Sequence, residues 1–108
     1  MFQNDVGTVL EFTCYDQDDL PLDLTNAVHA YLYIKHGNTI LKREMTIDSN
    51  PSTGKVSYII TAEDFTEGDV NYVFQVTVDF IDGSHYNGSI VEEHVAKPLE
   101  ADYVEPEA

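Results

Sequence analysis

The sequence is poor in basic residues, with five Lys and Arg against twenty Asp and Glu, which gives a formal net charge of −15. An acidic surface repels the phosphate backbone of nucleic acids and the anionic headgroups of membranes. We therefore expect no nucleic-acid partner and no attachment to a membrane. The charge favours solubility, and it would also suit a partner with a basic surface.

Long apolar runs are missing as well. No stretch approaches the ~18 consecutive apolar residues that a membrane-spanning helix needs, so no span is expected. Residues 1–7 lack the basic and apolar regions of a signal peptide. We expect the chain to fold in the cytoplasm where it is made, a condition that a virion protein assembled inside a host cell also meets.

Only one cysteine is present, Cys14, which excludes an internal disulfide. It shares a parity with Leu10 and Phe12 in an alternating run, so we interpret it as a small core residue. A nucleophilic cysteine would need a nearby His or Lys, and no sequence cue places one there. The sequence also lacks a Gly-x-Ser-x-Gly, phosphate-loop or dinucleotide motif. We therefore expect no catalytic residue and no enzyme activity.

The most regular pattern lies in residues 71–80. Five apolar residues at period two predict a long strand with one packed face: Tyr72, Phe74, Val76, Val78 and Phe80. The opposite face is polar and is expected to meet solvent: Asn71, Gln75, Thr77 and Asp79. Asp82-Gly83 then predicts a tight turn, because both residues tolerate positive φ.

Other alternating runs between turn residues predict further strands, over 8–15, 27–35, 39–47, 55–61 and 86–95. In the run 39–47, Arg43 interrupts the apolar face, which indicates an edge strand. The run 86–95 does not keep one parity, which indicates a bulge. Thr61-Ala-Glu-Asp64 has the pattern of a helix start, and Gly68 follows so soon that a single helical turn crossing between two sheets is expected.

The remaining apolar residues complete the expected core. One parity of the run 27–35 is predicted to point inward: Val28, Ala30, Leu32 and Ile34. Three leucines of the acidic loop that precedes it are expected to tuck beneath that loop: Leu20, Leu22 and Leu24.

These elements together predict an all-β fold, an immunoglobulin-like two-sheet antiparallel sandwich over residues 1–96 with one short helical turn. Residues 97–108 carry four acids and little to bury, and predict an extended acidic C-terminal tail. We expect a partner to hold this tail through Leu99, Tyr103 and Val104.

Two clusters of carboxylates are candidate calcium sites: Asp16, Asp18, Asp19 and Asp23, and Glu63, Asp64, Glu67 and Asp69. Calcium binds six to eight oxygens, often from an acidic loop, but neither cluster has the EF-hand spacing. The four histidines, at 29, 36, 85 and 94, show no metal-ligand spacing, and His29 and His94, which lie on predicted strands, would meet across a sheet only by chance. We expect turn-forming, solvated acids, with no metal and no cofactor.

Candidate binding residues lie on the predicted second strand. Tyr31 and Tyr33 project the same way as His29, and tyrosine is enriched at interfaces because it buries area at low entropic cost. The alternative is that both rings only pack on the pleated sheet. Exposed strand edges would offer a second route to a partner.

Two stretches resemble a known family. Asp16-x-Asp-Asp-x-Pro-Leu-Asp-Leu-Thr-x-Ala27 is similar to the acidic turn and second strand of the N-terminal domain of phage baseplate upper proteins. Asn50-Pro-x-x-Gly54-Lys-Val-x-Tyr58, Thr61-x-Glu-Asp-Phe65-x-x-Gly68 and Asp82-Gly83 resemble the rest of that domain.

The resemblance implies a non-enzymatic virion structural protein with an immunoglobulin-like fold. Such a module would attach to tail, baseplate, fibre or head proteins within an oligomeric assembly. A carbohydrate- or receptor-binding β-sandwich is the alternative, with Tyr86 or Tyr103 as an exposed aromatic. The absence of tryptophan counts against that alternative.

Overall fold

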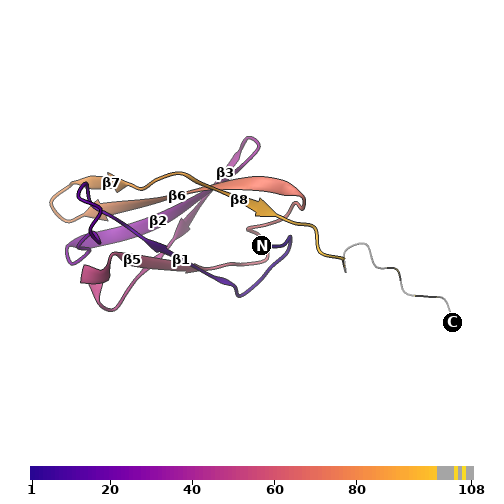
Figure 1. Cartoon of the computed structure of the whole chain (residues 1–108), viewed down its shortest axis with the longest axis horizontal. Coiled ribbons are helices and arrows are strands. Elements are labelled where there is room, and N and C mark those ends of the chain that lie inside the picture. The colour runs from indigo at the N-terminus through magenta and orange to yellow at the C-terminus, as the bar shows by residue number, and fades with distance from the viewer. Residues whose placement is uncertain (100–103, 105, 107–108) are drawn as a thin grey trace.

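The computed structural model describes residues 1–99, 104 and 106. Two antiparallel sheets pack face to face, and Figure 1 shows the sheet with β2 and β6 lying over the sheet with β1 and β5. The smaller sheet has the order β1-β5-β4, from Val9–Thr13, Lys55–Ile59 and Thr46–Ile47. The larger contains β3 (Thr39–Glu44), β2 (Ala27–His36), β6 (Val70–Phe80), β7 (His85–Asn87) and β8 (Val91–Val95).

The connections follow the order of an immunoglobulin-like sandwich. The chain crosses between the sheets from β1 to β2, from β3 to β4 and from β5 to β6, and makes hairpins between those crossings. β7 and β8 both pair with β6, at its C-terminal and N-terminal halves respectively. The expected all-β two-sheet fold is confirmed.

The core forms where the inner faces of the two sheets meet. Alternate residues of β6 and, from Ala30 onward, of β2 are buried as their period predicts. They belong to one core cluster with Val56 of β5 and with Ile60, which directly follows β5. Phe65, in the crossing before β6, packs edge-on against Tyr72 and Phe74, with ring centroids 5.1 and 6.0 Å apart. The predicted burial of Cys14 is also confirmed.

Two inward assignments were wrong. Val28 is exposed because a bulge between Ala27 and His29 shifts the register against β6. Leu20 is exposed because residues 16–20 close a tight loop, in which the Asp16 amide donates to the Leu20 carbonyl at 2.8 Å. Leu24 is buried as expected.

The expected strand over 39–47 divides into two strands in different sheets. β3 is the edge of the larger sheet, as Arg43 indicated, and β4 joins the smaller sheet. The buried Met45 lies at the switch, where its amide donates to the Ala30 carbonyl at 2.8 Å. A period-two pattern continues through such a switch, so the sequence did not reveal it.

The helical turn lies elsewhere than expected. Residues 61–64 form a non-helical turn, and the helical turn is the 3₁₀ segment η1, Pro51–Thr53. Asp64 accepts hydrogen bonds from the Thr61 amide and hydroxyl as a capping acid would, but the buried Phe65 follows at once and draws the chain into the core. The Thr61-x-x-Asp64 pattern therefore marks a local capping contact that forms here without a helix.

Two glycines of the resemblance motifs have a steric role. Gly54 adopts φ +71°, and a Cβ there would lie 2.6 Å from the Cys14 carbonyl oxygen. At Gly68 a Cβ would lie 2.8 Å from the Lys97 Cα and from the Gln3 side chain. Both positions therefore need glycine for close approach of another chain segment.

The N-terminal residues and the end of β8 meet beside Gly68. Phe2 forms a parallel bridge with Ala96, and the Gln3 amide donates to the Ala96 carbonyl at 2.8 Å.

The bulge expected in 86–95 is confirmed at residues 88–90, where the Gly88 amide still bonds the Val76 carbonyl. None of the helical segments in the described residues is long and apolar enough to span a membrane.

Candidate interaction surface

The outer face of the larger sheet carries the tyrosines that the sequence singled out. We call it the tyrosine face, and its residues come from β2, β3, β6 and the bulge: His29, Tyr31, Tyr33, Lys35, Ile40, Lys42, Glu44, Val73, Gln75 and Ile90. On β2 they alternate with the buried Ala30, Leu32 and Ile34, so the pleat forces them outward.

Lys42 and His29 order the two tyrosine rings. Lys42 on β3 places its Nζ 4.0 Å from the centroid of the Tyr31 ring and 5.8 Å from that of Tyr33. The His29 ring also stacks on Tyr31, with centroids 5.6 Å apart, and His29 Nδ1 lies 3.4 Å from a carboxylate oxygen of Glu44. Since the rings are held before any partner arrives, binding to them would cost little side-chain entropy.

An apolar hollow lies at one end of the tyrosine face. The depression has a volume of about 190 Å³ and is lined by six residues: Tyr33, Lys35, Ile40, Val73, Gln75 and Ile90. Ile40 and Ile90 are large aliphatic side chains that are exposed there. An exposed apolar patch with a polar rim is typical of a protein contact site.

Thr77 corrects the expectation that this whole face is wet. It is only 5% exposed, and its hydroxyl oxygen is buried without a hydrogen-bond partner in the described residues. In the sheet it stands between Tyr31 of β2 and Asn87 of β7. The tyrosine face is therefore packed densely enough to remove one of its own polar groups from water.

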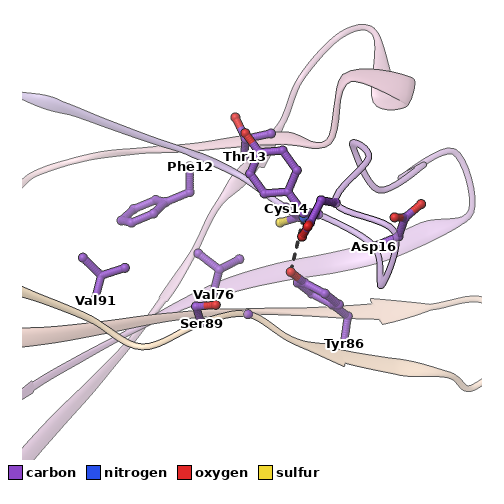
Figure 2. Close-up of a pocket in the computed structure, with 11 residues that line it drawn as sticks. Phe12, Thr13, Cys14, Asp16, Val76, Tyr86, Ser89 and Val91 are labelled. Carbon is purple, nitrogen blue, oxygen red and sulfur yellow. Dashed lines mark hydrogen bonds between the residues drawn. The ribbon is translucent and has the colours of Figure 1, made fainter.

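A second concave feature opens between the edges of the two sheets, beside β1 and the β7–β8 bulge. The cleft encloses about 380 Å³, and Figure 2 shows Phe12 from β1 lying over Val91 while the Tyr86 hydroxyl points across the cleft. The Tyr86 hydroxyl accepts a hydrogen bond from the Tyr15 amide at 3.4 Å. Tyr86 therefore joins the two sheets instead of presenting a free ring.

The acidic clusters do not assemble as metal sites. Asp16 accepts from the amides of Asp18 and Leu20, and Asp23 accepts from the amide and hydroxyl of Thr25, so both are turn formers. Across the described part of the chain, no group of three or more His, Cys, Asp or Glu is placed to hold a metal ion. His29 and His94 also stay apart, because they pair with Asp79 and Asn71 at opposite ends of β6.

Asp64 is the member of the second cluster with a distinct role. Its side chain is fully buried, and it accepts hydrogen bonds from Arg43 Nε at 2.8 Å, the Tyr58 hydroxyl at 2.6 Å and the Thr61 amide at 2.7 Å. Burial alone would raise the pKa of Asp64, but the bonds from Tyr58, Thr61 and Arg43 outweigh it and hold the pKa below the ordinary value. The group is an ionised structural anchor.

The predicted tail anchors are not gathered with the tyrosines. Leu99 is 90% exposed and borders a separate depression with Phe2 and Pro98, and Val104 is 82% exposed. Tyr103 lies outside the described residues. Lys42, Ile40 and Ile90 were not predicted from the sequence, although the alternation of β3 would have placed Ile40 and Lys42 beside the tyrosines once its pairing with β2 was known.

The described geometry defines a two-sheet antiparallel β-sandwich with an aromatic outer face. The chain matches the family model of the BppU N-terminal domain over residues 2–96. It therefore belongs to the family of baseplate upper protein N-terminal domains, as the resemblance implied, and is a phage baseplate-associated structural protein of the virion. No curated protein and no solved structure matched.

Proposed function

We propose that this chain is a non-enzymatic adaptor that attaches neighbouring virion proteins through the tyrosine face and the tail residues Leu99, Tyr103 and Val104. The observation that supports this most directly is the pre-ordered pair Tyr31 and Tyr33, fixed by Lys42 on an outer sheet face. Aromatic residues held beside exposed aliphatics are the usual centre of a protein interface. Family membership supplies the setting, a baseplate in which the partners are other virion proteins.

Incorporation into virions tests the proposal. Phage that lacks the wild-type gene is complemented with Tyr31→Ala/Tyr33→Ala, and purified particles are assayed for the protein. We expect a loss of incorporation of about tenfold or more, since truncation of central aromatic anchors costs about 2 kcal/mol or more. Tyr15→Ala is the matched control, because Tyr15 is an exposed tyrosine beside the other sheet. Equal incorporation of all three proteins would contradict the proposal.

The alternative function is a carbohydrate- or receptor-binding module, and the cleft lined by Phe12, Tyr15 and Tyr86 is the feature that would support it. The exposed Tyr15 ring, with Asp16 and Asp19 also lining the cleft, offers stacking and hydrogen-bonding groups for a saccharide. A glycan array tests this directly. A defined sugar whose binding is lost in Tyr15→Ala and retained in Tyr31→Ala/Tyr33→Ala would favour this alternative over the adaptor.

A further inference from the structure

We propose that the tyrosine face binds the acidic segment 99–107 of a second copy of this chain, with Val104 in the apolar hollow and carboxylates beside Lys35 and Lys42. This inference rests on the proposed function, because it names the partner of the same face. Charge, apolar fit and the exposure of the tail anchors support it.

Two lysines of the tyrosine face, Lys35 and Lys42, have no carboxylate partner among the described residues. Of the five basic residues, Arg43 is bound by Asp64 at 2.8 Å and Lys55 lies 3.9 Å from Glu11. Within the described residues, neither Lys35 nor Lys42 forms an ion pair with a carboxylate. Two lysines without ion pairs on one face stand out in a protein of net charge −15.

Carboxylates near that face already have partners. Glu44 lies 3.4 Å from His29, and Asp79 lies 2.5 Å from His85 Nδ1. Glu92, which is paired with Val73 across the β6–β8 ladder, accepts a hydrogen bond from the side-chain Nδ2 of Asn71 at 2.6 Å. The lysines are therefore left for carboxylates from another chain.

Lys35 and Lys42 flank the apolar hollow. Lys35 borders the hollow and is paired across the β2–β3 ladder with Ile40, while Lys42 is paired with Tyr33. A segment in which an aliphatic residue stands between acids would therefore fit, because it fills the hollow and places carboxylates beside the lysines. Residues 99–107 have this composition, since Val104 lies between Asp102 and Glu105, with Glu100 and Glu107 beyond them.

The described tail anchors are exposed, which leaves them available to a second copy. Leu99 and Val104 are 90% and 82% exposed, so the described tail anchors of a single chain are not docked on its own sheet. Reciprocal exchange of the segment between two copies would close a two-fold dimer, the commonest symmetric assembly.

Sedimentation equilibrium of the full-length protein over a micromolar to millimolar series tests the proposal. Physiological ionic strength is needed, because it screens the long-range repulsion between two chains of net charge −15 over about 8 Å while close ion pairs persist. We expect the wild type to reach dimer mass. Lys35→Glu/Lys42→Glu and Val104→Asp should each weaken self-association by about tenfold or more. Lys55→Glu, an exposed charge reversal on the smaller sheet, should weaken it far less.

Mixing the two defective proteins separates exchange between copies from other contacts. Lys35→Glu/Lys42→Glu keeps an intact tail and Val104→Asp keeps an intact face, so an equimolar mixture should recover a heterodimer with one such contact. Circular dichroism melting curves confirm that each variant is folded. A wild-type monomer throughout the series, or a dimer that neither variant weakens, would overturn the inference. Virions that still incorporate the wild-type protein through Tyr31 and Tyr33 in that case would leave the adaptor proposal standing.

Discussion

Arg43 Nε lies 2.8 Å from Asp64 Oδ1, and this contact joins the edge strand of the larger sheet to the crossing that follows the smaller one. The same carboxylate accepts from Tyr58 on β5, so one buried acid connects both sheets. In the sequence Arg43 only interrupts an apolar face. In the structure Arg43 is the charged partner that the buried Asp64 requires.

Removal of the Asp64 carboxylate should destabilise the sandwich strongly. Asp64→Ala leaves Tyr58 and Thr61 without their acceptor, and we expect a loss of about 2–4 kcal/mol in the free energy of unfolding. Urea denaturation at neutral pH measures this loss. Asp18→Ala, an exposed acid of the β1–β2 loop, is the control and should stay within about 0.5 kcal/mol of wild type. A similar loss in both variants would show that Asp64 has no special role.

The contribution of Asp64 should depend on pH in one direction. Its folded pKa lies below the ordinary value of 3.8, so the carboxylate stabilises the fold above that value. The contribution is lost as pH falls through the folded pKa, because the native state must then take up a proton. The stability difference between wild type and Asp64→Asn should thus be constant near neutrality and shrink below about pH 4. A difference that grows on acidification would contradict the assigned ionisation.

Cys14 should be inert in the native protein. Burial raises the pKa of its thiol to about 11, so about one molecule in a thousand carries the reactive thiolate at pH 8. Iodoacetamide labelling followed by mass spectrometry should therefore be slow in buffer and fast in urea beyond the unfolding midpoint. Fast labelling of the folded protein would show that the cleft between the sheet edges exposes Cys14.

Replacement of the buried Thr77 should increase the stability of the fold. Thr77→Val replaces a buried hydroxyl that has no partner in the described residues with a methyl group of similar volume, so we expect stabilisation of about 1 kcal/mol. Thr77→Ser keeps the hydroxyl, loses a methyl group and should destabilise. Thermal or urea unfolding of the two variants checks the sign. If Thr77→Val destabilised the protein, its hydroxyl would have a hydrogen-bond partner in solution.

The sequence predicted what depends on local periodicity. The alternation in 71–80 fixed β6 and its packed face, and Asp82-Gly83 fixed the hairpin after it. What failed depends on tertiary pairing. The Met45 switch keeps period two while it changes sheet, and the Thr61–Asp64 capping contact forms without a helix because Phe65 is drawn into the core. The same holds for the tyrosine face. Tyr31 and Tyr33 could be predicted from the alternation of one strand, but Lys42, which orders them, could be placed only once the β2–β3 register was known.

Hydroxyl-radical footprinting of the tyrosines tests the central claim most directly. Oxidation of Tyr31, Tyr33 and Tyr15 is compared between the free protein and the same protein in purified virions. The adaptor account predicts that Tyr31 and Tyr33 become protected severalfold in the virion while Tyr15 does not change. Equal oxidation of Tyr31 and Tyr33 in both states would contradict a role for the tyrosine face in attachment.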